Sequence, residues 1–143
     1  MVEAERGHDL NAMAELRYGK IPELEKALAA ALAACPEARV VEFTVAPQVS
    51  PASGLPYHEW LVEFSSPPSS LSTFQEALDA SMCAQNIYYR DLITGSILRP
   101  LVLTPLPAGA FISYMKSQGK LGGQNKVPRL SNDRVLAEGV LRT

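Results

Sequence analysis

The sequence has few of the residues that hold metals or form covalent cross-links. Its 143 residues include two cysteines, Cys35 and Cys83, which lie far apart in the sequence, and two histidines, His8 and His58. Disulfide frameworks and zinc sites are normally recognised by several cysteines or histidines at short, characteristic spacings. We therefore expect free thiols and no bound metal.

The sequence also lacks a long apolar run and a strong excess of charge. No stretch approaches the roughly 18 apolar residues of a membrane-spanning helix. Residues 1–9 (MVEAERGHD) are polar, unlike the start of a signal peptide. The formal net charge is −2, which does not favour nucleic-acid binding. These features predict a cytoplasmic chain with no membrane partner and no nucleic-acid partner.

The composition is that of a globular domain. Hydrophobic residues make up 47% of the chain and charged residues 20%, which are ordinary values for a folded protein. The length suffices for one domain with its own core. We predict a single domain over residues 21–143, preceded at residues 1–20 by an N-terminal extension or a short helix.

Hydrophobic periodicity predicts one helix and two strands in the first half. Apolar residues recur at helical spacing over 22–35. Apolar and polar residues alternate over 39–45 and 57–64, as in half-buried strands. Because a loop rich in proline connects these two segments, we expect them to pair antiparallel, with Phe43 and Trp60 largely buried.

Acidic residues alternate with the apolar residues of the second predicted strand. Glu59 and Glu63 lie on the opposite face from Trp60, because successive side chains of a strand point to opposite faces. We expect both carboxylates to be solvated.

The second half is predicted to contain three helices and one further strand. The expected elements are a helix over 72–89 with a capping box at Ser72 and Gln75, an edge strand over 97–103, a helix over 107–119 that ends at Gly119, and a short helix after Ser131 or Asn132. The full order is helix, strand, strand, helix, strand, helix, loop, helix. This order predicts an α+β fold, with a small, mostly antiparallel sheet of about three or four strands packed with helices.

The most distinctive stretch is basic and lies between the last two predicted helices. Residues 115–134 (MKSQGKLGGQNKVPRLSNDR) contain one acidic residue, Asp133, and five basic ones: Lys116, Lys120, Lys126, Arg129 and Arg134. Gly122 and Gly123 precede three side chains that donate hydrogen bonds, on residues 124–126. Such a loop can bind an anion such as a phosphate or a carboxylate. It can equally be a solvated loop between two helices.

Three blocks of the sequence resemble a known enzyme family. The run GKLGGQNKVPRLSNDR at 119–134 is similar to the C-terminal signature of the auxin-responsive (Gretchen Hagen) acyl-acid amido synthetases, in their bacterial form. PLVLTPLPAGAF at 100–111 and LDASMCAQNIYYR at 78–90 are similar to a strand–helix junction and a helix of the same family. The blocks follow one another as they do in the family, and the resemblance covers roughly residues 22–141.

The resemblance implies roles for the loop residues. In this family the C-terminal domain is a lid that swings over the active site of a larger adenylation domain, and the lysine that matches Lys126 is catalytic. The matching candidates for substrate or nucleotide binding are Gly122, Gly123, Gln124, Asn125 and Arg129. From the residues alone, Arg129 can bind an anion, or it can pair with Asp133 or Glu138.

The resemblance also implies a partner. The family's reaction needs a large N-terminal domain that binds ATP and the acyl acid, and this sequence has neither a P-loop nor a Ser/Thr-Gly-rich phosphate loop. The resemblance implies ATP and Mg²⁺ for the complete enzyme, with its large N-terminal adenylation domain in the same gene or in a separate chain. No cofactor is expected on this chain alone. The implied reaction forms an acyl adenylate and conjugates the acyl group to an amine or amino acid. The alternative is a non-catalytic α+β module that binds a small anionic ligand or a protein.

Overall fold

The computed structural model describes residues 21–49, 51–52, 54–119, 127–131 and 133–142. In order, these residues form α2 (Ile21–Ala34), β1 (Arg39–Gln48), β2 (Tyr57–Ser66), α3 (Leu71–Gln85), α4 (Ile87–Thr94), β3 (Val102–Leu106), α5 (Ala110–Ser117) and α6 (Val135–Arg142). The predicted first helix and first two strands are confirmed, and both strands extend beyond their predicted ends. None of the described helices is long and apolar enough to cross a membrane.

The central strand of the sheet is β2. It pairs antiparallel with β1, as predicted, and parallel with β3. A parallel neighbour requires a connection that carries the chain back to the starting end of the sheet, and α3 and α4 provide it. The predicted α+β fold is confirmed, with a sheet of mixed direction.

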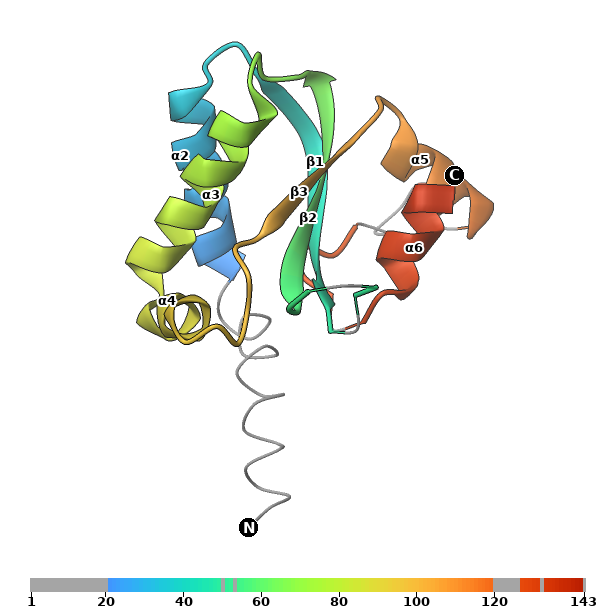
Figure 1. Cartoon of the computed structure of the whole chain (residues 1–143). Helices are drawn as coiled ribbons and strands as arrows, with labels where there is room; N and C mark the ends of the chain where they lie inside the picture. The colour runs from blue at the N-terminus through green and yellow to red at the C-terminus, as the bar shows by residue number, and fades with distance from the viewer. Residues whose placement is uncertain (1–20, 50, 53, 120–126, 132, 143) are drawn as a thin grey trace.

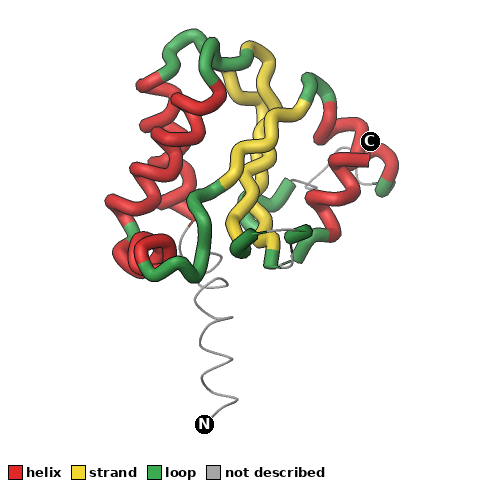
Figure 2. The backbone as a smooth tube through the Cα atoms, viewed as in Figure 1, coloured by secondary structure: helices red, strands yellow, loops and turns green. Residues whose placement is uncertain are grey.

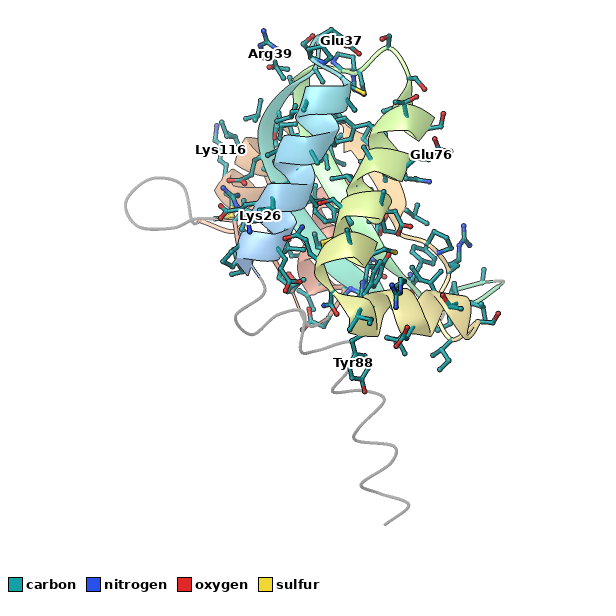
Figure 3. All side chains as sticks on the ribbon, turned by 90° about the vertical axis from the view of Figure 1, so that its left-hand side faces the viewer. Lys26, Glu37, Arg39, Glu76, Tyr88 and Lys116 are labelled. Carbon is teal, nitrogen blue, oxygen red and sulfur yellow. The ribbon has the colours of Figure 1, made fainter. Side chains whose placement is uncertain are left out.

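Helices cover both faces of the sheet, as Figures 1 and 2 show. One layer contains α2, α3 and α4, and the opposite layer contains α5 and α6. Figure 3 views the first layer from outside, where α2 and α3 lie side by side and carry the exposed side chains of Lys26 and Glu76. The sheet is therefore the middle layer of three, and residues on both of its faces are buried.

Each helix layer packs on the sheet through its own apolar core. The core under α2, α3 and α4 contains Phe43 and Trp60, whose rings stack with their centroids 5.5 Å apart. These side chains are 3% and 1% exposed, so their predicted burial is confirmed. The core under α5 and α6 is smaller and includes Leu61, Phe111 and Val140.

A β-bulge near the start of β1 changes the predicted alternation. Val40 pairs with Phe64, and Glu42 pairs with the adjacent Glu63, so Val41 is an extra residue in β1. The extra residue lets Val40 and Phe43 pack in the same core, whereas strict alternation would place them on opposite faces. Val41, predicted to share the face of Phe43, is 52% exposed.

The predicted helix over 72–89 is wrong in its bounds. The chain forms two helices that meet at Asn86, whose backbone is extended and whose side chain accepts a hydrogen bond from the backbone N–H of Tyr89. Asparagine competes with helical backbone in this way and favours cap positions. The cap of α3 is Ser70, not Ser72, and its hydroxyl accepts a bond from the N–H of Thr73.

The predicted strand over 97–103 is also misplaced, since β3 begins at Val102. The backbone N–H of Leu101 donates to the hydroxyl oxygen of Tyr89 at 3.1 Å and to Asp79 Oδ1 at 3.2 Å. It is therefore not available to a neighbouring strand. Side chains of the first helix layer therefore satisfy the backbone that was expected to pair in the sheet. The strand is an edge strand, as predicted.

One histidine is fully buried between the sheet and α4. His58 is 4% exposed and stacks on Tyr89, with ring centroids 5.5 Å apart. Burial disfavours the charged imidazolium and lowers the pKa of His58 to about 4. The Tyr89 hydroxyl donates to Asp79 Oδ1 at 2.7 Å, and burial raises the pKa of Tyr89 well above its usual value.

Candidate functional site

Glutamates on one face of the sheet organise the layer that carries the basic stretch. Glu42 comes from β1, and Glu59 and Glu63 come from β2, all on the face that α5 and α6 cover. The expectation that Glu59 and Glu63 are solvated is wrong, because they are 6% and 2% exposed. The alternation along the strand was predicted correctly, but a second helix layer covers the face that was taken to be exposed.

Glu63 caps the N-terminus of α5. Its two carboxylate oxygens accept hydrogen bonds from the backbone N–H groups of Gly109, at 2.9 Å, and Phe111, at 3.1 Å. Gly109, the N-cap residue, has a φ of +88° and no side chain with which to cap the helix. The free N–H groups and positive end of a helix favour an anion. A carboxylate from the sheet therefore fixes where α5 begins.

Glu59 links the sheet to the start of α6. Its carboxylate accepts a hydrogen bond from the hydroxyl of Thr104 on β3. Its other oxygen lies 2.7 Å from the guanidinium of Arg134, which also approaches Glu138 at 3.8 Å. Because Arg134 immediately precedes α6, this ion pair ties that end of the helix to β2.

The segment 127–131, here called the return segment, runs along the free edge of β1. The backbone N–H of Val45 donates to the carbonyl of Arg129, and the N–H of Ser131 donates to the carbonyl of Val45, both at 2.8 Å. Val45 and Leu130 thereby form a parallel bridge. The return segment satisfies backbone groups of β1 that an edge strand otherwise leaves unpaired.

Side chains strengthen the attachment of the return segment. The hydroxyl of Thr44 donates to the carbonyl of Pro128 at 2.7 Å. Val127, the first described residue after the basic loop, is 8% exposed and packs in the core under α5 and α6. The chain is thus held by backbone, side-chain and apolar contacts from its first described residue after the loop.

Arg129 forms an ion pair with Glu42, rather than with Asp133 or Glu138. Its guanidinium carbon also lies 4.8 Å from the centroid of the Phe43 ring, in a cation–π contact. The side chains of Arg129 and Glu42 are 35% and 24% exposed, so the pair is partly shielded from water.

The other predicted site residues fall outside the described part of the chain. These are Gly122, Gly123, Gln124, Asn125 and Lys126. The structure does place what flanks them. Before them, α5 ends at Ser117 and Gly119 has a φ of +68°, as expected of a glycine that ends a helix; after them comes the return segment.

Sequence reasoning did not indicate that the three glutamates bind the segments around the basic stretch. Two of the five basic residues in 115–134 are the partners of Glu42 and Glu59, so their charge is compensated within the domain. The available signal was that acids occupy one face of two adjacent predicted strands, while a basic excess appears later in the chain. Opposite charges in two parts of one chain suggest ion pairs within the domain as readily as a site for an anion.

Among the described residues there is no metal site, and one of the hollows that they form is a groove with an uncharged lining. Among them, no group of three or more His, Cys, Asp or Glu side chains could hold a metal ion. The groove has a volume of about 400 Å³ and lies at the start of α5, lined by residues 105–110, Ser113, Val140 and Leu141. Its lining side chains carry no charge and therefore do not form an ionic site.

The sequence model of the GH3 family C-terminal domain matches residues 22–135. The chain belongs to the GH3 family. The resemblance to the Gretchen Hagen amido synthetases, inferred above from three short blocks, is thereby confirmed over most of the chain. No curated protein matches the sequence.

Solved structures of GH3 enzymes share the fold. The chain is similar to the GH3.15 acyl acid amido synthetase, with a TM-score of 0.65 and 19% identity over 84% of this chain and 24% of that one. It is also similar to the AtGH3.15 acyl acid amido synthetase in complex with 2,4-DB, with a TM-score of 0.64 and 18% identity over 84% and 23% of the two chains. The chain thus spans about a quarter of the length of these enzymes.

Proposed function

We propose that the chain is the C-terminal lid domain of an ATP-dependent acyl-acid amido synthetase and works with a large N-terminal adenylation domain. In the proposed reaction, an acyl carboxylate attacks the α-phosphate of ATP and releases pyrophosphate. An amine, such as that of an amino acid, then attacks the acyl carbon, AMP leaves, and an amide bond forms. Family membership and the fold support this proposal, and the short span of the chain implies the partner.

The observation that carries the proposal is the attachment of the two described segments that flank the basic loop. Glu63 fixes the start of α5, which leads into the loop, and the contacts with β1 fix the return segment that leaves it. A positive charge stabilises a transition state best when its position is set before the reaction. The helix that precedes the loop and the return segment that follows it are thus both attached to the sheet, which supports this role.

Lys126 is the residue that we assign to the chemistry. Its ammonium would offset the negative charge that develops as the carboxylate attacks the α-phosphate. Closure of a lid can deliver such a charge only after the substrates have bound and water has been displaced. Gly122, Gly123, Gln124 and Asn125 would place backbone and side-chain donors beside the same anion.

The described residues of the domain offer no site for Mg²⁺. The three glutamates of the sheet are engaged by arginines, a hydroxyl and the backbone of α5, and a metal ion would have to displace these partners. We therefore assign the metal ion and the main nucleotide contacts to the adenylation domain. The lid contributes charge and closure.

ATP–pyrophosphate exchange tests this function. The chain alone should give background exchange with any acyl acid, whereas the adenylation domain joined to it, or mixed with it, should exchange. Exchange by the chain alone would overturn the assignment as a lid. Full activity of the adenylation domain without residues 21–143 would favour a non-catalytic module that binds an anion or a protein.

A further inference from the structure

Arg129 stands close to the proposed catalytic lysine in the sequence and matches a family position expected to bind substrate or nucleotide. In the structure its carbonyl and its guanidinium are already engaged. Its carbonyl accepts a hydrogen bond from Val45, its guanidinium pairs with Glu42, and the same group lies over the ring of Phe43. These contacts attach both its backbone and its side chain to β1.

We infer that Arg129 is a positioning residue held by Glu42, and that it does not bind the substrate anion. This inference rests on the proposed function, because the chain segment that it positions is the one that follows Lys126. Glu42 is accordingly a second positioning residue, one that no motif indicated.

The surroundings of Glu42 oppose the release of Arg129. Glu42 lies directly opposite Glu63 in the antiparallel pair of β1 and β2. Like charges at such positions destabilise a sheet unless each has a partner. Glu63 has the N-terminus of α5, and Glu42 has Arg129. If Arg129 moved to a phosphate or carboxylate, Glu42 would lose its ion-pair partner while it still lies opposite a second carboxylate.

Arg134, further along the same stretch, makes a similar ion pair with the sheet. It too belongs to the basic stretch, and it too pairs with a sheet glutamate, Glu59. Both arginines of the stretch therefore face the sheet. The positive charge offered to a substrate must then come from lysine side chains, which suits an ammonium that delivers a point charge.

Substitutions of Glu42 and Arg129 in the complete enzyme distinguish a positioning residue from a ligand. If Arg129 is a positioning residue, Glu42→Gln and Arg129→Gln each lower kcat by about tenfold with little change in the KM of ATP or of the acyl acid. The double variant is then no worse than either single variant. The exchange variant Glu42→Arg/Arg129→Glu recovers most of the lost rate, since it restores an ion pair across the same positions.

A ligand role predicts a different pattern. Arg129→Gln would raise KM, Glu42→Gln would leave the rate unchanged or raise it by freeing the guanidinium, and the exchange variant would stay slow. That pattern overturns the inference, as does unchanged kinetics in all the variants. Glu76→Gln on the exposed surface of α3 serves as the matched control.

Hydrogen exchange in the isolated chain keeps this test separate from the proposed function. Loss of the pair should speed amide exchange at Val45 and Ser131, the donors that hold the return segment, by about tenfold, and the exchange variant should restore protection. If the complete enzyme proves inactive, the proposed function fails while this measurement still decides whether Glu42 holds Arg129. Unchanged protection in Glu42→Gln contradicts the inference.

Discussion

Glu42 and Glu63 lie directly opposite each other on the antiparallel strands β1 and β2, and different segments of the chain bind their carboxylates. Arg129 of the return segment pairs with Glu42, and the first N–H groups of α5 bind Glu63. The two segments that flank the basic loop are thus attached to neighbouring positions on one sheet.

The cap on α5 is expected to be a major source of stability for the second helix layer. Glu63→Ala removes two hydrogen bonds from a carboxylate that is 2% exposed and leaves the N–H groups of Gly109 and Phe111 without partners. A buried bond to a charged group contributes about 1.5–3 kcal/mol. We expect urea denaturation to show a loss of about 2 kcal/mol or more.

Glu76→Ala provides the comparison for this measurement. It removes an exposed carboxylate from α3 and should change the free energy of unfolding by less than about 0.5 kcal/mol. Equal stabilities of the Glu63→Ala variant and the unchanged chain would show that the cap is dispensable.

The packing of α6 on α5 depends on the absence of a side chain at Gly139. A Cβ there would lie 2.3 Å from Cε1 of Tyr114. Although alanine in a helix interior is favoured over glycine by about 1 kcal/mol, an overpacked contact costs roughly 1–3 kcal/mol. We expect Gly139→Ala to destabilise the domain in thermal unfolding. In a Tyr114→Ala background the same substitution should be neutral or stabilising; the same loss in both backgrounds would exclude this contact as the cause.

His58 makes stability depend on pH in a defined direction. Its pKa is about 4 in the folded chain and near 6.5 when unfolded. Between these values the unfolded chain binds the extra proton, so the free energy of unfolding falls as the pH falls. From pH 7 to pH 5 this loss should reach about 2 kcal/mol.

His58→Phe separates this effect from the titration of carboxylates. Phenylalanine keeps an aromatic ring against Tyr89 and does not titrate, so the variant should lose less stability than the unchanged chain over the same interval. Urea denaturation at pH 7 and pH 5 measures the difference. Identical losses in the two proteins would show that His58 does not control the acid response.

The parts of the fold that could be predicted are those governed by local periodicity. Phe43 and Trp60 lie on two strands in which apolar and polar residues alternate. That alternation predicted the burial of both side chains, and the proline-rich loop between the strands predicted their antiparallel pairing. Asn86 was harder to interpret, because a single side chain that caps the next helix divides a segment whose periodicity looks continuous.

Long-range contacts explain the remaining errors. Glu59 and Glu63 appear solvated in a strand considered alone, and only the second helix layer, which arrives more than 40 residues later, buries them. The predicted start of the third strand was wrong for a similar reason, since the backbone N–H of Leu101 donates to Tyr89 and Asp79. Arg129 could be named as a candidate from its motif, but its partner Glu42 lies in a different part of the chain.

Substitution of Lys126 in the complete enzyme tests the central claim most directly, with Lys120→Ala as the control for a general loss of positive charge. We predict that Lys126→Ala slows adenylation by at least about tenfold, or roughly 1.4 kcal/mol in the transition state, and leaves the melting temperature of the isolated chain nearly unchanged. Lys120→Ala should have a much smaller effect on the rate. Equal slowing by the two substitutions, or unfolding caused by Lys126→Ala, would contradict the assignment of Lys126 to the chemistry.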